Sequence, residues 1–163
     1  MATKTSNSHA KTKPSGLLTR EELIDELNGD LAREYQAIIA YVNYSQVLKG
    51  AQYMNIAKEL VIHATEELDH AVKIAKQIDY LGGNPTVKPE PVKTSKKAED
   101  MLRFDLENEM RTIGNYRTRI RQAESLGEFA LCEILREISI QEQEHAIDLA
   151  TALGIDVPPI PEV

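Results

Sequence analysis

Four long segments of the chain carry apolar side chains at alternating steps of four and three residues, which is the spacing of one face of an α-helix. The first segment follows Thr19, and the second follows Gly50 after only a tight turn. The third comes after the proline-containing stretch 82–97, and the fourth comes after Gly127. All seven prolines lie outside the four segments. The pattern therefore predicts four α-helices.

Each predicted helix has one continuous buried face, or seam. The seams of the first two helices are Leu27, Leu31, Glu34, Ile38, Tyr41, Ser45 and Leu48, and then Ile56, Leu60, His63, Glu67, His70, Ile74, Gln77 and Leu81. The seams of the last two are Leu102, Leu106, Glu109, Ile113, Tyr116, Ile120 and Ala123, and then Leu131, Leu135, Ile138, Glu142, His145, Leu149 and Ala152. Every seam contains at least one ionisable residue, which is unusual for buried positions.

The connections between the segments predict the topology. Thr19 and Glu22 have the spacing of a capping box at the first helix, and the tight turn at Gly50 makes the first two helices antiparallel neighbours. The 16 residues of 82–97 reach about 50 Å if extended, close to the ~45 Å length of a 30-residue helix. This stretch can cross the bundle from end to end, so that the third helix runs parallel to the second. We expect an all-α four-helix bundle of two antiparallel hairpins joined by a long crossover.

The ionisable seam residues repeat, and their residue numbers in the two halves of the chain differ by a constant offset of 75. Each half has a lone Glu, a Tyr seven residues later, and a Glu-x-x-His motif that follows the lone Glu at the same distance in both halves. These residues are Glu34, Tyr41, Glu67 and His70 in the first half, and Glu109, Tyr116, Glu142 and His145 in the second. Chance alone would give about 0.4 Glu-x-x-His matches in a chain of this composition. Two matches at the same offset indicate that the chain contains two copies of one helical hairpin, each with its functional residues.

Four Glu and two His would thus meet inside the bundle, with no Lys or Arg on the seams. A buried carboxylate costs several kcal/mol unless it is paired or bound to a metal ion. Four carboxylates and two neutral imidazoles carry a net charge of about −4, which two divalent cations would balance. Oxygen and imidazole ligands without thiolates suit iron or manganese better than structural zinc.

Composition narrows the class of protein. The 163 residues suit one folded domain, and a net charge of −7 favours cations over nucleic acid as partners of its body. The single cysteine, Cys132, excludes an internal disulfide framework. No apolar run has the length of a transmembrane helix, and residues 1–16 lack the apolar region of a signal peptide. We therefore expect a cytoplasmic protein with no membrane contact.

Both ends of the chain are expected to lie outside the bundle. We predict a flexible basic tail over 1–18, the bundle over 19–154, and a proline-rich tail over 155–163 without a fifth helix. Lys4, Lys11 and Lys13 make the first tail basic. It is either simply solvated or a phosphate-binding arm that gives weak, salt-dependent DNA binding.

The repeated ligand set resembles that of the ferritin-like di-iron superfamily, in its bacterioferritin type. The type includes Dps-like proteins with a bacterioferritin-like site inside each subunit, and the resemblance covers 19–154. It implies two Fe ions per subunit, with Mn as an alternative. The resemblance implies that Glu34 and Glu109 each bind one metal ion, and that the carboxylates of Glu67 and Glu142 bridge the two ions. It implies that His70 and His145 are the imidazole ligands. Tyr41 and Tyr116 would donate hydrogen bonds to the ligands.

Several neighbouring residues have less certain roles. Glu107 rivals Glu109, but its offset from Glu34 is 73 rather than 75, so we assign it to the flank of the helix. His63 is either a hydrogen-bonded core residue, a partner of the ligands or an additional ligand. Glu66 and Gln141 each precede a ligand histidine by four residues and are candidates to bond to it.

Departures from related proteins refine the expected function. Bacterioferritins bind haem through a Met at the position of Leu68, so we expect no haem. Rubrerythrin-like peroxidases usually append a four-cysteine iron domain, and thiol-containing Dps-like proteins use a cysteine pair. Cys132 is alone, and we interpret it as a small buried hydrophobic residue.

The resemblance therefore implies an iron-storage and detoxifying ferroxidase. It would oxidise Fe(II) with hydrogen peroxide or dioxygen and store Fe(III) mineral in a homo-oligomeric cage. The missing fifth helix and haem ligand favour a dodecamer over a 24-mer. The alternative is a rubrerythrin-like di-metal oxidase or peroxidase that stores no iron, and a DNA-compacting role of the basic tail would be secondary.

Overall fold

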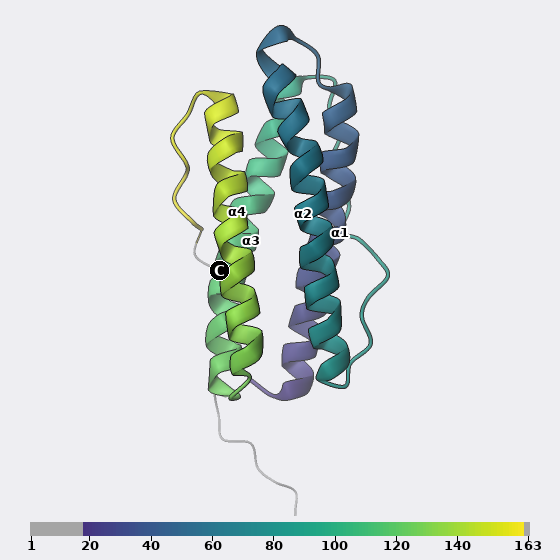
Figure 1. Ribbon diagram of the computed structural model, residues 1–163, viewed down its shortest axis with the longest axis vertical. Helices are drawn as coiled ribbons and strands as arrows, with labels where there is room; N and C mark the ends of the chain where they lie inside the picture. The colour runs from purple at the N-terminus through teal and green to yellow at the C-terminus, as the bar shows by residue number, and fades with distance from the viewer. Residues whose placement is uncertain (1–17, 162–163) are drawn as a thin grey trace, which may run out of the picture.

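Four long helices lie side by side in the computed structural model, which describes residues 18–161 (Figure 1). They are α1 (Arg20–Val47), α2 (Met54–Tyr80), α3 (Ala98–Ser125) and α4 (Phe129–Leu153). A short 3-10 turn, η1 (Ala51–Tyr53), precedes α2, and no strand occurs within 18–161. The predicted all-α four-helix bundle is confirmed.

The helix ends follow from local sequence. The Thr19 hydroxyl accepts a hydrogen bond from the Glu22 amide (3.1 Å), and the Glu22 carboxylate accepts one from the Thr19 amide (2.7 Å), so the capping box forms. At the other end of the bundle Gly154 has a left-handed φ of 68° and caps α4. The first helix ends at Val47, before Gly50, because Gly50 itself takes up the turn with a φ of 124°.

The crossover runs the length of the bundle beside α1, so that α2 and α3 point the same way (Figure 1). Its backbone is held by side chains and carbonyls of α1 at successive turns. Asn28 bonds to the backbone of Asn84 and Thr86, and the Gln36 amide donates to the Pro91 carbonyl (2.6 Å). The Tyr44 hydroxyl donates to the Lys93 carbonyl. These contacts satisfy backbone groups of a segment that has no secondary structure of its own.

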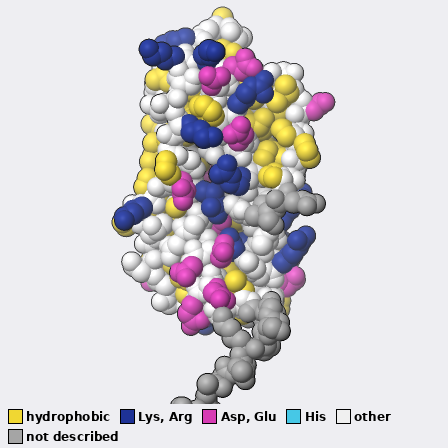
Figure 2. Space-filling view, turned by 180° about the vertical axis from the view of Figure 1, so that it is seen from behind, with side chains coloured by type: hydrophobic (Ala, Val, Ile, Leu, Met, Phe, Trp, Pro, Cys, Tyr) yellow, Lys and Arg dark blue, Asp and Glu magenta, His cyan; other side chains and the backbone are white. Residues whose placement is uncertain are grey.

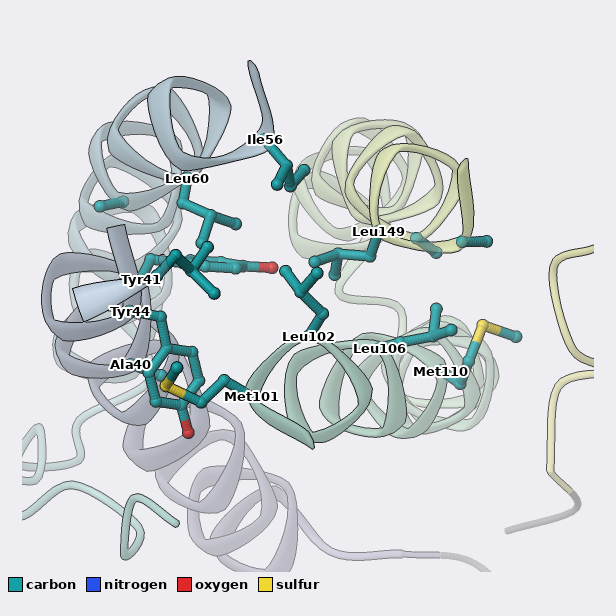
Figure 3. Packing of buried hydrophobic residues seen from close by; sticks show 14 of the residues in the cluster. Ala40, Tyr41, Tyr44, Ile56, Leu60, Met101, Leu102, Leu106, Met110 and Leu149 are labelled. Atoms are coloured by element: carbon teal, nitrogen blue, oxygen red, sulfur yellow. The ribbon is translucent and has the colours of Figure 1, made fainter. Parts of the chain in front are cut away.

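The interior is divided into two apolar clusters along the bundle axis. The upper cluster, in the orientation of Figure 1, lies between the η1 end and the middle of the bundle. Its members include Tyr44 and Leu106, and also Tyr41, Leu60, Leu102 and Leu149, which surround the space between the helices in Figure 3. The lower cluster contains Leu23, Leu27, Leu31, Ile74, Ile78, Tyr116, Leu131, Cys132, Leu135 and Ile138. Cys132 is 1% exposed, as expected of a small buried hydrophobic residue.

Five seam positions differ from the prediction because their side chains are only partly buried: Ile38, Ser45, Gln77, Ile120 and Ala152. Beside two of them, Tyr44 and Ile78 are buried instead. Tyr44 precedes Ser45, whereas Ile78 follows Gln77, so the buried faces of α1 and α2 depart from the strict repeat in opposite directions.

A buried ion-pair network between α1 and α3 was not predicted from the seams. Arg119 is 3% exposed, and its guanidinium donates to Asp30 (2.7 Å) and Glu26 (2.7 Å). Asp30, which is 1% exposed, also pairs with Arg33. The network joins the first hairpin to the second at the lower end of the bundle.

The tails and the surface add little to this picture. The predicted basic tail lies, apart from Leu18, outside the described residues, so DNA binding through it stays a prediction. No helix follows Leu153 within 18–161, and no helix there combines the length and apolar character needed to cross a membrane. The face in Figure 2 mixes Lys and Arg with Asp and Glu, and shows none of the three histidines of the described chain.

The Arg119 network gives a stability prediction. Asp30→Ala should lower the free energy of unfolding by about 3 kcal/mol, because Arg119 then keeps a buried charge with only part of its pairing. Urea unfolding of the chelator-treated protein measures this. Arg103→Ala removes an exposed ion pair with Glu99 (2.7 Å) and should change the free energy by less than about 0.5 kcal/mol. Equal effects of the two substitutions would contradict the assignment.

Candidate metal centre

Six ionisable residues form a polar layer between the two apolar clusters. None of them is more than 3% exposed, and each helix contributes at least one. They are Glu34 of α1, Glu67 and His70 of α2, Glu109 of α3, and Glu142 and His145 of α4. The i, i+3 spacing places each Glu and His pair on one face of its helix. The structure thus brings together all six residues that the sequence repeat singled out.

The layer contains two overlapping groups of four possible metal ligands. One group is Glu34, Glu67, His70 and Glu142, and the other is Glu67, Glu109, Glu142 and His145. The ligand atoms of each group lie within 4.8 Å of one another. Glu67 and Glu142 belong to both groups, which is the arrangement of two adjacent metal positions with shared carboxylates.

His70 lies at the centre of the first group. Its Nδ1 atom is 3.0 Å from Glu67 Oε2, 3.3 Å from Glu142 Oε1 and 3.5 Å from Glu34 Oε2. Its Nε2 atom points away from the carboxylates and lies 2.9 Å from Gln141 Oε1. Since an amide oxygen accepts hydrogen bonds, Nε2 carries a proton and Nδ1 is the nitrogen available to a metal ion.

His145 repeats this arrangement in the second group. Its Nδ1 atom is 3.0 Å from Glu67 Oε1, 3.6 Å from Glu142 Oε2 and 4.0 Å from Glu109 Oε2. Its Nε2 atom lies 2.8 Å from Glu66 Oε2. Both histidines therefore direct the same nitrogen into the layer, and a polar side chain behind each fixes the ring.

The partners behind the two histidines differ in charge. Glu66 is a carboxylate, Gln141 is a neutral amide, and the Gln141 amide donates to Glu66 Oε1 (3.2 Å). The four side chains form one hydrogen-bonded strap from His70 to His145 across α2 and α4. A carboxylate makes the imidazole in front of it a stronger electron donor than an amide does. The two ligand groups are therefore chemically unequal.

Tyrosines connect the two hairpins within the layer. The Tyr41 hydroxyl of α1 donates to Glu109 of α3, and the Tyr116 hydroxyl of α3 donates to Glu34 of α1. Burial, and then the negative charge of the bonded Glu, raise the pKa of both phenols well above their usual value. Both tyrosines therefore remain donors at every ordinary pH.

The protonation of the layer follows from burial and mutual charge. Burial, and then the charges of Glu67 and Glu142, raise the pKa of Glu34 and of Glu109 well above their usual value. Burial acts in the same direction on Glu67, but the nearby His145 and His70 rings lower its pKa overall. The pKa of Glu142 is also lowered, because the two nearby histidines outweigh burial and the charge of Glu67.

The pKa values of the two histidines are raised, although burial acts to lower them. Burial alone would lower the pKa of His145, but the nearby carboxylates of Glu142 and Glu67 raise it to about 12. For His70, the nearby carboxylates of Glu142, Glu34 and Glu67 likewise outweigh burial and raise the pKa. Without metal, these shifts favour neutral Glu34 and Glu109, and they favour imidazolium ions that offset the charges of Glu67 and Glu142.

His63 lies next to the layer and is 2% exposed. Its ring stacks on the His145 ring at a centroid distance of 4.1 Å, and its Nε2 atom is 3.3 Å from Asp148 Oδ2. Burial, and then the positive charge of His145, lower the pKa of His63 to about 4 in spite of Asp148. Its Nδ1 atom has no hydrogen-bond partner, so His63 is not a fully bonded core histidine.

Two further acids show what the seam pattern missed. Asp30 and Asp105 are each 1% exposed, and they precede Glu34 and Glu109 by four residues, so they obey the same repeat offset. Burial, and then the charge of Glu67, raise the pKa of Asp105. The repeat offset could have revealed this pair. The rival Glu107, by contrast, points to solvent with its side chain 59% exposed, near Lys93.

A narrow opening leads to the layer between α1 and α3. It encloses about 10 Å³, and its wall includes Gln36, Asn108 and Thr112 beside the buried carboxylates. Such a volume corresponds to roughly one water molecule. Only small species could pass without movement of side chains.

Known proteins share this sequence and fold. The family model for the ferritin-like domain matches residues 24–155. A bacterioferritin of Desulfovibrio desulfuricans is 28% identical over 77% of this chain and 71% of its own length. A bacterial ferritin of Pseudomonas aeruginosa is 27% identical over 82% of this chain and 88% of its own.

Two solved structures resemble the model closely. A ferritin-like, diiron-carboxylate protein of Bacillus anthracis has a TM-score of 0.79 and 33% identity, over 82% of this chain and 96% of its own. A dodecameric thioferritin, the bacterioferritin-related protein of Bacteroides fragilis, has a TM-score of 0.77 and 27% identity, over 84% and 87%. The family match over most of the chain, together with these relatives, shows that the protein belongs to the ferritin-like family.

Proposed function

We propose that this protein is a ferroxidase that stores iron: it binds two Fe(II) ions as substrates in the polar layer, oxidises them with hydrogen peroxide or dioxygen, and deposits Fe(III) in a cage of identical chains. The observation that carries the proposal is the pair of overlapping ligand groups that share Glu67 and Glu142. The names of the relatives, bacterioferritin and bacterial ferritin, agree with iron storage.

The unsatisfied atoms of the layer fit metal ions. Buried atoms without a hydrogen-bond partner include Glu34 Oε2, Glu67 Oε1, both Glu142 oxygens and His145 Nδ1. Leaving a buried polar atom unbonded costs about 1 to 3 kcal/mol. These atoms lie close together without the alignment of hydrogen bonds, as expected of ligands that converge on common centres. The ligand set of oxygen and imidazole suits Fe(II), with Mn(II) as an alternative.

The chain's own residues would bind and orient the substrates. Glu34 and His70 would hold one ion, Glu109 and His145 the other, and Glu67 and Glu142 would bridge them. Tyr41 and Tyr116 would keep the terminal carboxylates in position. Oxidation by peroxide balances when each of two Fe(II) ions gives one electron, the O–O bond breaks, and two hydroxide ions form. With dioxygen, the same two electrons yield peroxide.

Haem is not part of the proposal. Leu68 follows the bridging Glu67 and offers no ligand atom, and its side chain points outward, being 54% exposed. The proposed iron chemistry therefore relies on the polar layer alone.

Removing a ligand should abolish fast oxidation. We expect Glu67→Ala and His145→Ala to lower the initial rate of Fe(II) oxidation at least about 100-fold, because each substitution removes a ligand of the paired site. Stopped-flow absorbance of Fe(III) formation measures the rate. Circular dichroism should show that each variant still folds as a helical bundle before the rates are compared.

The matched control is Glu107→Gln, which removes an exposed carboxylate two residues from Glu109. It should oxidise Fe(II) at the parent rate. Parent rates in both ligand variants would refute the site. Oxidation without retention of many irons per assembly would instead favour the rubrerythrin-like alternative, which turns over a substrate and stores nothing.

Metal binding should release protons. The pKa values of Glu34, Glu109, His70 and His145 are all raised, so the metal-free protein favours the protonated form of each group. Divalent ions should therefore displace protons from the layer, and binding should weaken as the pH falls. Calorimetry with Mn²⁺ in two buffers of different ionisation enthalpy measures the proton release at pH 7. Binding without any proton release would contradict the raised pKa values.

The cage should be a dodecamer. The Bacteroides fragilis neighbour is dodecameric, and within 18–161 no helix follows α4 that could line a channel of a larger shell. Light scattering should therefore give a particle mass of twelve times the chain mass of 18.3 kDa. A mass twice as large would indicate a 24-mer, and the mass of only two chains would exclude a cage.

A further inference from the structure

A surface cavity of about 320 Å³ is lined by residues of α2 and α4, the two front helices in Figure 1, and by Gln52 of η1. Glu59 of α2 and Asp148 of α4 lie in its wall. Both are partly exposed, and His63 lies buried beside them, one helical turn after Glu59. A buried histidine that the proposed oxidation site does not use therefore lies beside the two acids of the cavity wall.

Glu59, His63 and Asp148 form a third group of possible metal ligands. One ligand atom from each lies within 4.8 Å of the other two. No Lys or Arg of residues 18–161 forms an ion pair with either carboxylate. Within the same residues, the one ionic contact of these two acids is that of Asp148 with His63, at 3.3 Å. Two carboxylates and one imidazole can thus neutralise and bind a divalent cation.

A purely structural role in the core explains the surroundings of His63 poorly. A buried core histidine normally bonds through both ring nitrogens, but His63 Nδ1 has no partner. Its remaining contacts are the stacked His145 ring and the edge of the Tyr41 ring, 5.4 Å away. The His63 imidazole is buried, has one polar contact and lies close to two partly exposed acids. A role as a metal ligand explains these features better.

We propose that Glu59, His63 and Asp148 bind a divalent transition-metal ion at a third site in the wall of this cavity. One nitrogen and two oxygen ligands suit Fe(II), Mn(II) or Co(II). The site goes beyond the proposed oxidation chemistry and does not depend on it, because it shares no residue with the two ligand groups of the polar layer.

Possible ligand atoms connect the third site with the polar layer. His63, Glu66 and His145 form a further group within 4.8 Å. His63 thus links the cavity group to this intermediate group, and His145 links the intermediate group to the layer. An ion in the cavity wall would lie one imidazole ring away from the paired site, as a holding position for iron beside it.

Counting bound cobalt tests the third site. The full-length protein, stripped with chelator, is dialysed to equilibrium against Co²⁺ and its metal content measured. We expect about three ions per chain in the parent, and one fewer in Asp148→Asn and in Glu59→Gln, whose affinity at this site should fall at least about tenfold. Both residues are partly exposed, so the variants should fold, which circular dichroism checks.

The matched control is Glu144→Gln, which removes an exposed carboxylate one turn before Asp148 on α4. It should bind as many ions as the parent. If Asp148→Asn and Glu59→Gln lose no ion, or if Glu144→Gln loses one as well, the third site is refuted.

A further variant separates this proposal from the proposed function. Glu67→Ala should lose ions of the polar layer and keep the one in the cavity. If Glu67→Ala loses ions while Asp148→Asn does not, the third site fails and the oxidation site stands. The opposite result would support the third site and count against the oxidation site.

Discussion

Burying four carboxyl groups and two imidazoles in one layer is the constraint on which the rest of this structure depends. The apolar clusters above and below the layer cannot solvate charge, and an unpaired buried carboxylate costs several kcal/mol. Without metal, the raised pKa values of Glu34, Glu109, His70 and His145 favour bound protons, which offset the negative charge of the layer. Divalent cations could take the place of those protons. The same geometry therefore suits both a folded metal-free protein and a metal-loaded one.

The layer also ties the two hairpins to each other. Tyr41 belongs to the upper cluster and bonds to Glu109 of the other hairpin, while Tyr116 belongs to the lower cluster and bonds to Glu34. Glu34 and Glu109 therefore each accept a hydrogen bond from a tyrosine of the other hairpin. Packing of the apolar clusters thus positions the polar groups, and the crossover along α1 fixes the relative direction of the hairpins.

Much of this arrangement could be predicted from the sequence. The period of apolar residues and the capping box at Thr19 predicted the helices, and the constant repeat offset identified the six residues that meet in the layer. The buried Arg119 could not be found in this way, because it pairs with Asp30 across two helices, and such a pairing depends on tertiary contact. The same holds for Asp148, whose closeness to His63 arises only when α2 and α4 pack. The burial of Tyr44 rather than Ser45, and of Ile78 rather than Gln77, likewise depends on how the helices pack.

The central claim is that the polar layer binds a pair of iron ions between the hairpins. Crystals grown with Fe(II) under exclusion of air, and measured on both sides of the iron absorption edge, test it most directly. The account predicts two anomalous peaks within the polar layer of each chain, one next to His70 Nδ1 and one next to His145 Nδ1, with Glu67 and Glu142 between them. A single peak, or iron bound only outside the layer, would contradict it.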